Sequence, residues 1–503
     1  MALESHHKHH KLHFLLVPFL CPGHLIPMVD IARLLVNHGA FVTIVTTPLH
    51  ATRINPLIDT VNASKLRIQV VQFEISVLEF GLPEGCESLE LVPSRELIRN
   101  FMVALSKLQT PIEELIEKNK KKKEPTPISC ILVDKFNYWM ENVAMKFQIP
   151  RLIFDGTSCM NLVVLHNLFK SKVYENVQES NPIIVVPNLP HRIELTKSQL
   201  PLELNPEARD LRDFDEKIRT SQESAYGVVI NSFEELELEY VKEYKKVKGN
   251  KVWCIGPVSL SCNNDVGQRG NKSKIGIDSC MKFLDSWPPN SVVYVCLGSL
   301  NNLALAQFQE LALALESCNF PFIWVMKEDD SLKKWLQESG FEERTKERGL
   351  IIHGWAPQVL IFSHNAIGVF LTHCGWNSTL EAICGGVPMI TWPMFADQFF
   401  NEKLVVQILG IGEKLGSEIA IPLGKQENYG ASVKRERIVE AIEKVIGDGD
   451  GENKKKEERR ESVGKLAELA KKSMELGGSS YLNMKILLED MERLTFGKPY
   501  HSS

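Results

Sequence analysis

Short apolar runs and amphipathic stretches of helix length alternate along almost the whole chain, and this alternation restricts the fold more than any other feature. The chain opens with an apolar run at residues 12–17 and a turn at residues 18–23. A stretch follows whose apolar side chains recur every three or four positions until Gly39. A second apolar run, residues 41–46, comes directly after it. Strand, helix and strand at this spacing predict a βαβ unit and therefore a parallel sheet.

The alternation forms two blocks that a polar segment separates. The further apolar runs of strand length in the first block are residues 66–73, 128–133, 151–154, 227–231 and 252–255. Those of the second block are residues 292–297, 321–326, 350–355, 368–371 and 387–392. Between the blocks, residues 259–274 are polar and rich in Gly, Asn and Ser, which is typical of a linker.

Chain length and these blocks together predict two domains. A chain of 503 residues is too long for one ordinary domain, and its 44% of hydrophobic residues supply two cores. We therefore predict two doubly wound α/β domains that face each other across a cleft, where the carboxyl ends of the strands would bind ligands. The predicted segments are a flexible tail (1–11), an N-terminal domain (12–257), a linker (258–277), a C-terminal domain (278–480), and a final helix and tail (481–503).

Charge and cysteine content argue against several classes of protein. A net charge of -5 is mild for this length, so we expect no nucleic-acid partner. The His-rich start lacks the apolar core and cleavage site of a signal peptide, and the apolar residues 12–20 are too few to span a bilayer. The 11 cysteines are odd in number and contain no CxxC pair, which disfavours a disulfide framework or a structural zinc site. We expect a cytoplasmic protein without stable membrane insertion.

The densest group of polar side chains lies within residues 355–398, where a predicted strand ends and a helix begins. Its polar residues at that point are His373, Trp376, Asn377, Ser378 and Glu381. Such groups are costly to bury unless they are used. A helix start offers free backbone N–H groups and the positive end of the helix dipole, so it predicts an anion site. One turn further on, Glu381 can accept from both hydroxyls of a ribose, and Asp397 and Gln398 can bind sugar hydroxyls.

Residues 355–398 resemble the signature box of the plant secondary-metabolite UDP-glycosyltransferases, family 1 of the glycosyltransferases, from the first Trp to the last Gln. The window reads WAPQVLIFSHNAIGVFLTHCGWNSTLEAICGGVPMITWPMFADQ. The order of the flanking elements resembles the family over nearly the whole chain. The stretches PMVDIARLL, TKSQLP, GVVINSFEELE and NSVVYVCLGS are similar to the group that acts on terpenoids, flavonoids and hormones. The resemblance implies a GT-B fold of two facing Rossmann-like domains and transfer of a sugar from a UDP-sugar.

The resemblance also implies a donor-binding role for each position of the box. The residues implied to bind the nucleoside are Trp355, which stacks on uracil, together with Ala356, Gln358 and Glu381. Those implied to hold the diphosphate are Ser299 in the preceding LGS turn, His373, Asn377 and Ser378. Those implied to contact glucose are Trp376, Asp397 and Gln398. A final Gln is similar to members that use UDP-glucose, whereas a His is typical of members that use galactose.

A histidine and an aspartate follow two apolar runs of the first block. His24 lies in the turn that opens the first helix, so the rule for α/β sheets predicts that it faces the cleft. Asp134 ends the run CILVD, where a buried carboxylate needs a partner. A lone histidine is usually structural, but the resemblance implies that His24 is the general base and that Asp134 orients it. The local sequence is Pro-Gly-His where the family more often has Gln-Gly-His.

These roles imply a single displacement with inversion, in which His24 takes the acceptor proton as its oxygen attacks the anomeric carbon. We expect a monomer that binds UDP-glucose and a small hydroxylated acceptor and that needs no metal or other cofactor. The DGD at residues 448–450 is interpreted as a turn rather than as a metal-binding motif.

Two alternatives to this function remain. The first is the same reaction with another UDP-sugar donor. The second is a non-catalytic nucleotide-sugar-binding protein, which would have no use for His24 beside Asp134. A dinucleotide oxidoreductase is disfavoured because no GxGxxG follows the first run.

The acceptor should be bound by loops and helix faces of the first block. These are residues 77–83, 136–140, 155–166 and 200–204. Phe136, Tyr138 and Trp139 favour an apolar acceptor that contains rings. Asp155 stands where relatives often carry His. Flavonoid, triterpenoid, phenylpropanoid and hormone acceptors all agree with these residues.

Overall fold

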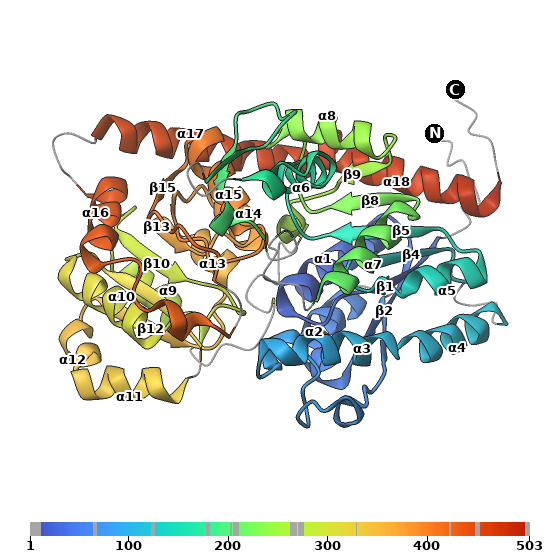
Figure 1. Cartoon of the computed structure of the whole chain (residues 1–503), viewed down its shortest axis with the longest axis horizontal. Helices are drawn as coiled ribbons and strands as arrows, with labels where there is room; N and C mark the ends of the chain where they lie inside the picture. Colours follow the sequence, from blue (N-terminus) through green and yellow to red (C-terminus); the bar gives the residue numbers. More distant parts are fainter. Residues whose placement is uncertain are drawn as a thin grey trace, which may run out of the picture.

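The computed structural model describes residues 12–63, 68–121, 126–177, 182–201, 204, 211–261, 269, 276–327, 329–421, 424–447 and 453–497. Within these ranges, two parallel sheets flanked by helices form two α/β domains side by side (Figure 1). The predicted fold class is therefore confirmed. The tail at residues 1–11, the DGD at residues 448–450 and all of residues 262–275 except Arg269 lie outside the described residues.

The first sheet contains seven of the described strands, in the order β3-β2-β1-β4-β5-β8-β9. Their bounds are β1 His13–Val17, β2 Phe41–Thr46, β3 Ile68–Gln72, β4 Cys130–Asp134, β5 Arg151–Asp155, β8 Gly227–Ile230 and β9 Val252–Cys254. All neighbouring pairs are parallel; Leu15 of β1 pairs with Thr43 of β2 and with Ile131 of β4. β1, β4 and β5 are buried along their whole length, which explains their continuous apolar runs. The strand order reverses between β1 and β4, where such a sheet binds its ligands.

The helices of the first domain follow the strands in alternation. They are α1 (Pro22–Asn37), α2 (Pro48–Ala63), α3 (Ile98–Ser106), α4 (Gln109–Lys120), α5 (Met140–Phe147), α6 (Cys159–Ser171), α7 (Arg212–Glu223) and α8 (Leu238–Val247). A small antiparallel hairpin of β6 (Ile183–Val185) and β7 (Glu194–Thr196) was not predicted from the sequence. The alternating pattern therefore indicates the main helices and strands and misses the short hairpin.

The second sheet has six strands among the described residues, in the order β12-β11-β10-β13-β14-β15. Their bounds are β10 Val292–Cys296, β11 Phe322–Met326, β12 Gly349–His353, β13 Ile367–Thr372, β14 Met389–Thr391 and β15 Gly412–Lys414. The helices of this domain are α9 (Ile277–Asp285), α10 (Leu305–Ser317), α11 (Asp330–Ser339), α12 (Phe341–Thr345), α13 (Gln358–Phe362), α14 (Trp376–Cys384), α15 (Gln398–Glu402), α16 (Arg435–Ile446) and α17 (Asn453–Met474). Here the order reverses between β10 and β13, and α14 follows β13.

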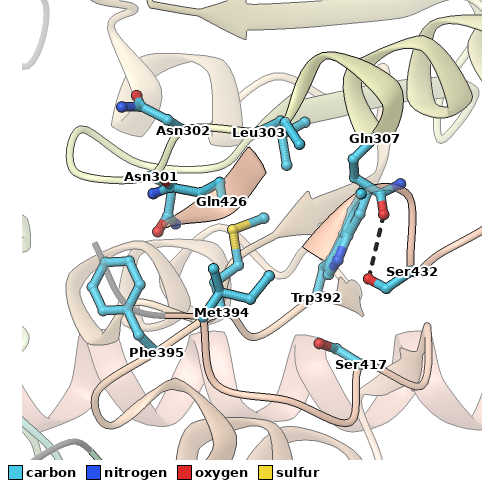
Figure 2. Close-up of a pocket in the computed structure, with 13 residues that line it drawn as sticks. Asn301, Asn302, Leu303, Gln307, Trp392, Met394, Phe395, Ser417, Gln426 and Ser432 are labelled. Atoms are coloured by element: carbon cyan, nitrogen blue, oxygen red, sulfur yellow. Dashed lines mark hydrogen bonds between the residues drawn. The ribbon is translucent and has the colours of Figure 1, made fainter. Parts of the chain in front are cut away.

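A pocket lies beside the loops that follow β10 and β14 (Figure 2). Leu303 and Gln307 line it from the first of these loops and from α10, and Trp392 and Phe395 line it from the second. None of the residues predicted to bind the donor lines this pocket. It therefore borders the predicted site without containing it.

The last helix, α18 (Ser479–Phe496), packs on the first sheet although it follows the second domain in the chain. Its Met484, Leu487 and Met491 belong to the apolar core that surrounds β1 and β4. An ion pair of 2.9 Å joins Asp490 of this helix to Lys251, which immediately precedes β9. Figure 1 shows α18, in red, running along β8 and β9. The sequence left open which domain this helix would contact, and the structure assigns it to the first.

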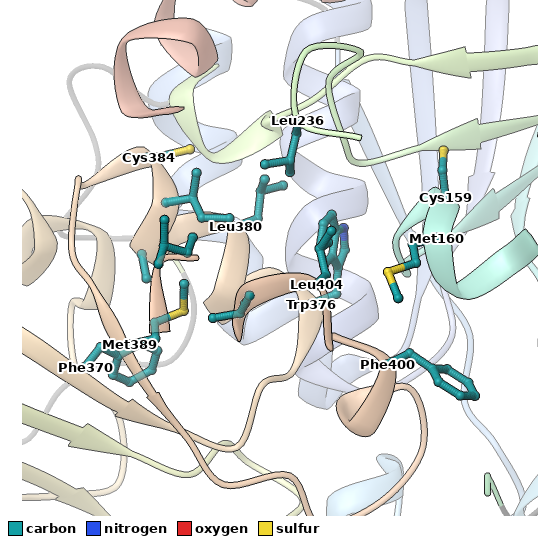
Figure 3. Packing of buried hydrophobic residues seen from close by; sticks show 14 of the residues in the cluster. Cys159, Met160, Leu236, Phe370, Trp376, Leu380, Cys384, Met389, Phe400 and Leu404 are labelled. Atoms are coloured by element: carbon teal, nitrogen blue, oxygen red, sulfur yellow. The ribbon is translucent and has the colours of Figure 1, made fainter. Parts of the chain in front are cut away.

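One apolar cluster spans both domains. It contains Met160 and Leu236 of the first domain together with Trp376 and Leu404 of the second (Figure 3). Because interiors of this kind are close-packed, the cluster restricts how the two sheets face each other. No helix within the described ranges combines the length and the apolar character that a membrane span requires.

Met491→Ala should destabilise the first domain, because the Met491 side chain is fully buried and its sulfur lies 3.4 Å from that of Cys130. Truncating a buried methionine costs about 2–5 kcal/mol. The urea midpoint of unfolding should fall accordingly. Leu482→Ala is the matched control, because Leu482 lies on the same helix and is 44% exposed; we expect a change of at most about 0.5 kcal/mol. An unchanged midpoint in Met491→Ala would contradict the packing of α18 on this core.

Candidate active site

The ends of β1 and β4 bring a histidine and an aspartate together at the reversal of strand order. His24 lies in the first turn of α1, and Asp134 is the last residue of β4. The distance from His24 Nδ1 to Asp134 Oδ2 is 2.7 Å. The other carboxylate oxygen, Oδ1, accepts the backbone N–H of Phe136 at 3.0 Å. Because the carboxylate accepts a hydrogen bond from Nδ1–H, the imidazole keeps Nε2 available to take a proton.

Two phenylalanine rings restrict the orientation of the His24 imidazole. Phe19 and Phe136 contact it edge to face, with ring centroids 5.5 and 5.4 Å from that of His24. Of the three aromatic residues predicted to favour a ring-containing acceptor, Phe136 is the one that contacts His24. Trp139 is buried in the core of the first domain, and Tyr138 packs against Phe214 of α7. The prediction for Trp139 is therefore wrong, because its side chain faces the core.

A buried ion pair stands beside the histidine and the aspartate. Lys135 directly follows Asp134, and its Nζ lies 3.1 Å from Oδ1 of Asp155 at the end of β5. Asp155 is almost fully buried and also accepts the hydroxyl of Thr157 at 2.8 Å. The sequence analysis did not identify Lys135, although its place directly after a strand-end aspartate was an available signal. The pair explains why a carboxylate is tolerated at position 155.

In the second domain, α14 begins at the carboxyl end of β13 and presents an uncapped helix start. Gly375 precedes it without a side-chain cap, and the backbone N–H groups of residues 376–378 have no acceptor within the described part of the chain. Three free N–H groups and the positive end of the helix dipole form a site that suits an anion. The predicted anion-binding geometry is therefore present at this helix.

His373 lies beside this helix start and is neutral at neutral pH. Burial lowers its pKa to about 4, although the backbone of Cys296 partly offsets the effect. Two glycines give the ring its space. A Cβ at Gly298, whose φ is +82°, would lie 2.6 Å from Nε2 of His373, and a Cβ at Gly375 would overlap the same atom. Ser299 directly follows Gly298, the glycine that packs against the His373 ring.

The predicted nucleoside-binding residues also lie together. Gln358 Nε2 donates to Glu381 Oε2 at 2.8 Å and to the Ser378 hydroxyl at 3.1 Å. Gln358 in turn accepts the Tyr294 hydroxyl at 3.2 Å. Arg269, which the sequence analysis did not identify, contacts the remaining oxygen of Glu381. Its backbone carbonyl accepts the indole N–H of Trp355 at 3.1 Å.

The two domains meet at this site. The Asn377 side chain of α14 donates to the backbone carbonyl of Gly23 at 2.6 Å. Gly23 is the neighbour of His24, so this hydrogen bond places the free helix start against the turn that carries the histidine. Ser158 of the first domain donates to Asn401 of the second at 3.3 Å. The pair of His24 and Asp134, the free start of α14 and the polar residues around Glu381 therefore lie at one interface.

Comparison with known proteins identifies the family to which this arrangement belongs. Residues 251–415 match the family model described as UDP-glucoronosyl and UDP-glucosyl transferase. The chain is 47% identical over 489 residues to UDP-glycosyltransferase 73E1 of Stevia rebaudiana, with 96% of both chains covered. It is 45% identical over 502 residues to UDP-glycosyltransferase 73C3 of Arabidopsis thaliana, covering 98% of this chain and 99% of the relative. The chain belongs to the plant family 1 UDP-glycosyltransferases.

Solved structures of UDP-glycosyltransferases share the fold. Glycyrrhiza uralensis UGT73P12 in complex with glycyrrhetinic acid 3-O-monoglucuronide is 34% identical, has a TM-score of 0.87, and is matched over 97% of both chains. Arabidopsis thaliana UGT89C1 in complex with UDP-L-rhamnose is 30% identical, with a TM-score of 0.70 over 96% of this chain and 99% of that one. This UDP-glycosyltransferase therefore has the GT-B fold that the resemblance implied.

The structure corrects two expected side-chain roles. The Trp376 indole, expected to contact glucose, is 3% exposed and donates to the backbone carbonyl of Asn231 at 2.7 Å. The Asn377 side chain, expected at the diphosphate, instead bonds Gly23 and accepts from Asn231 at 3.3 Å. Both side chains join the two domains because α14 lies at their interface. What these two residues offer to a ligand is their backbone N–H groups.

The residues expected at the sugar are held in fixed orientations. Gln398 is 4% exposed, and its Oε1 accepts the N–H groups of Met394 and Phe395 at 2.8 and 3.1 Å. Asp397 accepts the Asn401 side chain at 2.7 Å. Burial raises the pKa of Asp397, and the hydrogen bond from Asn401 and the charge of Lys135 oppose that rise. No group of three or more His, Cys, Asp or Glu side chains in the described ranges is arranged to hold a metal ion.

Gly375→Ala should weaken UDP binding, because the added methyl group would overlap His373 and displace it from the helix start. Overpacking of this kind costs about 1–3 kcal/mol, so we expect the dissociation constant to rise by roughly 5- to 100-fold. Isothermal titration with UDP measures it. Gly464→Ala on α17 is the control, because no atom lies within 4 Å of its Cβ position. Unchanged UDP affinity in Gly375→Ala would remove His373 from the donor site.

Proposed function

We propose that this UDP-glycosyltransferase is an inverting, metal-independent O-glucosyltransferase that moves glucose from UDP-glucose to a hydroxyl of a small apolar plant metabolite. The observation that carries the proposal is the 2.7 Å contact between His24 Nδ1 and Asp134 Oδ2. This pair adjoins the free start of α14 through the hydrogen bond from Asn377 to Gly23. A non-catalytic nucleotide-sugar-binding protein would need the helix start but not the pair.

In this reaction the acceptor oxygen attacks the anomeric carbon while His24 Nε2 takes the hydroxyl proton. The new C–O bond forms on the face opposite to UDP, and the bond from the anomeric carbon to the β-phosphate oxygen breaks. Asp134 stabilises the imidazolium that results, as in a catalytic triad. The N–H groups of residues 376–378 stabilise the charge that develops on UDP. No step in this sequence requires a metal ion or a cofactor.

Glucose is the proposed sugar because the signature box ends in Gln398, as in members that use UDP-glucose. Its fixed Oε1 leaves the Nε2 amino group as the part of the side chain that can donate to a sugar hydroxyl. Asp397 beside it supplies the acceptor. The relative UGT89C1 was solved with UDP-L-rhamnose, so another UDP-sugar is the alternative donor.

The acceptor is proposed to be a triterpenoid or sapogenin, a flavonoid or a hormone. Phe19 and Phe136 beside His24 support an apolar acceptor. UGT73P12 was solved with glycyrrhetinic acid 3-O-monoglucuronide, which supports a large polycyclic one. We further propose that the protein acts as a monomer in the cytoplasm. A panel of aglycones incubated with UDP-glucose, with UDP release as the readout, tests the acceptor class.

His24→Ala should lower kcat by about 10²–10⁴-fold, the range for loss of a general base, because no other group then accepts the acceptor proton. UDP affinity should barely change, because the second domain supplies the donor residues. Asp134→Ala should lower kcat by less. The double variant should be little slower than His24→Ala, because the two residues act as a unit. UDP release with an alcohol acceptor measures all three.

His38→Ala is the matched control for these variants. His38 follows the last turn of the same helix, where its Nδ1 contacts the Leu34 carbonyl at 2.8 Å, so it lies far from the reaction. Its kcat should equal that of the unmodified enzyme. Near-normal turnover of His24→Ala would overturn the mechanism, and lost UDP binding in that variant would assign His24 to the donor site instead.

Gln398→His should raise the rate with UDP-galactose relative to that with UDP-glucose, because the side chain next to the sugar changes its hydrogen-bonding groups. The unmodified enzyme should prefer UDP-glucose, and both rates should be unaffected by EDTA. Competition between the two donors, followed by mass spectrometry of the product, measures the ratio. Equal use of both donors by the unmodified enzyme would contradict the assignment of Gln398, and loss of turnover in EDTA would contradict metal independence.

A further inference from the structure

A single arginine joins the two domains at the nucleoside end of the site. Arg269 is the one residue between positions 262 and 275 that the structure describes, and it is almost fully buried. Its Nε donates to Asp30 Oδ2 at 2.8 Å, and its Nη1 donates to Glu381 Oε1. Asp30 belongs to α1 of the first domain and Glu381 to α14 of the second. One guanidinium therefore bridges carboxylates from both domains.

Both carboxylates depend on this cation. Asp30 is fully buried and Glu381 is nearly so. A buried carboxylate without a cationic or hydrogen-bonding partner costs several kcal/mol, and removing one member of a buried ion pair leaves that cost uncompensated. Arginine suits the position, because its planar group directs separate N–H bonds toward two acceptors at once, whereas a lysine ammonium is a compact point charge.

Arg269 also contacts two of the residues that the proposed function assigns to the nucleoside. Its guanidinium holds one oxygen of Glu381, while Gln358 holds the other at 2.8 Å. Its backbone carbonyl fixes the edge of the Trp355 indole at 3.1 Å. A carboxylate has about four lone-pair sites, so Arg269 and Gln358 orient Glu381 and still leave it able to accept the two ribose hydroxyls.

On its other side, Arg269 contacts the helix that carries the base. Asp30 lies on α1, whose first turn contains His24. The hydrogen bond from Asn377 to Gly23 fixes the start of α1 at the anion site, and Arg269 fixes the middle of the same helix at the nucleoside site. α1 is thereby attached to the donor domain at two points.

We propose that Arg269 is a positioning residue for the donor, which orients Glu381 and Trp355 for the uridine and ties α1 to the donor domain. This inference rests on the proposed function, because it takes Glu381 as the ligand of the ribose. Loss of the guanidinium should leave Asp30 and Glu381 as two buried carboxylates facing the same site, and Glu381 should then no longer hold the geometry that recognises the ribose diol.

The test compares UDP with 2′-deoxy-UDP, which lacks one of the two ribose hydroxyls. The unmodified enzyme should bind UDP more tightly than the deoxy nucleotide. In Arg269→Met the dissociation constant for UDP should rise on the order of 10- to 100-fold, the scale of one lost hydrogen bond to a charged group. The ratio between the two nucleotides should fall toward one. A purely structural role would weaken both nucleotides equally, so the ratio separates positioning from loss of stability.

Two further variants sharpen the test. Asp30→Asn in the Arg269→Met background should recover part of the UDP affinity, because it removes one of the two buried negative charges that the guanidinium contacts in the unmodified enzyme. Arg269→Lys should retain more of the ratio than Arg269→Met. Arg192→Met is the matched control; Arg192 is exposed and pairs with Glu194 at the surface, so both affinities should stay unchanged.

The outcomes separate this inference from the proposed function. If the unmodified enzyme binds both nucleotides equally, the ribose role of Glu381 is wrong and the inference is overturned with it. If the unmodified enzyme discriminates and Arg269→Met discriminates equally well, the inference alone is overturned. The inference alone is also overturned if Arg269→Met binds UDP as tightly as the unmodified enzyme does.

Discussion

The hydrogen bond from the Asn377 side chain to the Gly23 carbonyl brings two incomplete sites together. The first domain carries the histidine and its aspartate. The second domain carries the free start of α14. Trp376 reinforces the contact through its bond to Asn231, and the apolar cluster around it joins both domains. A change in the approach of the two sheets would therefore separate His24 from the free start of α14.

Buried charges at this interface occur together with partners from other elements. Asp134 pairs with His24, Asp155 pairs with Lys135, and Arg269 serves Asp30 and Glu381 together. Such pairs contribute little net stability compared with apolar packing, but breaking one is costly. They therefore select one arrangement of strand ends and helices over others. Because these contacts connect α1, β4, β5 and α14, the position of His24 is fixed from several directions.

The sequence predicted the helices and strands that are marked by a regular pattern or a continuous run of apolar side chains. β1 and β4 are buried on both faces, so each appears as a continuous apolar run that length and flanking turns identify as a strand. The family resemblance implied that Asp134 orients His24. The structure shows why the two meet, because His24 follows β1 and Asp134 ends β4, the two strands that flank the reversal of strand order. β15 was missed because it has three residues, two of them Glu413 and Lys414, and lies at a sheet edge. A short polar edge strand leaves no apolar pattern.

The sequence did not predict contacts that depend on how the domains approach each other. A motif assigns a position to a ligand, but it does not state whether the side chain or the backbone makes the contact, and Trp376 and Asn377 show the difference. Lys135 and Arg269 are charged residues that read as ordinary surface or linker positions until their partners are known. Those partners lie on other strands or in the other domain. They are too far away in the sequence for the repeat pattern of a helix or strand to indicate the contact.

The path of the chain gives the interface a further constraint. The chain passes from the first domain to the second before α9, and it returns between α17 and α18. Because Met484, Leu487 and Met491 of α18 complete the core around β1 and β4, the first domain is finished only by residues that follow the second. The two domains are thus joined covalently at both ends of the second one. An exchange of first domains between relatives must therefore carry α18 along, since the domain that holds His24 and Asp134 otherwise loses part of its own core.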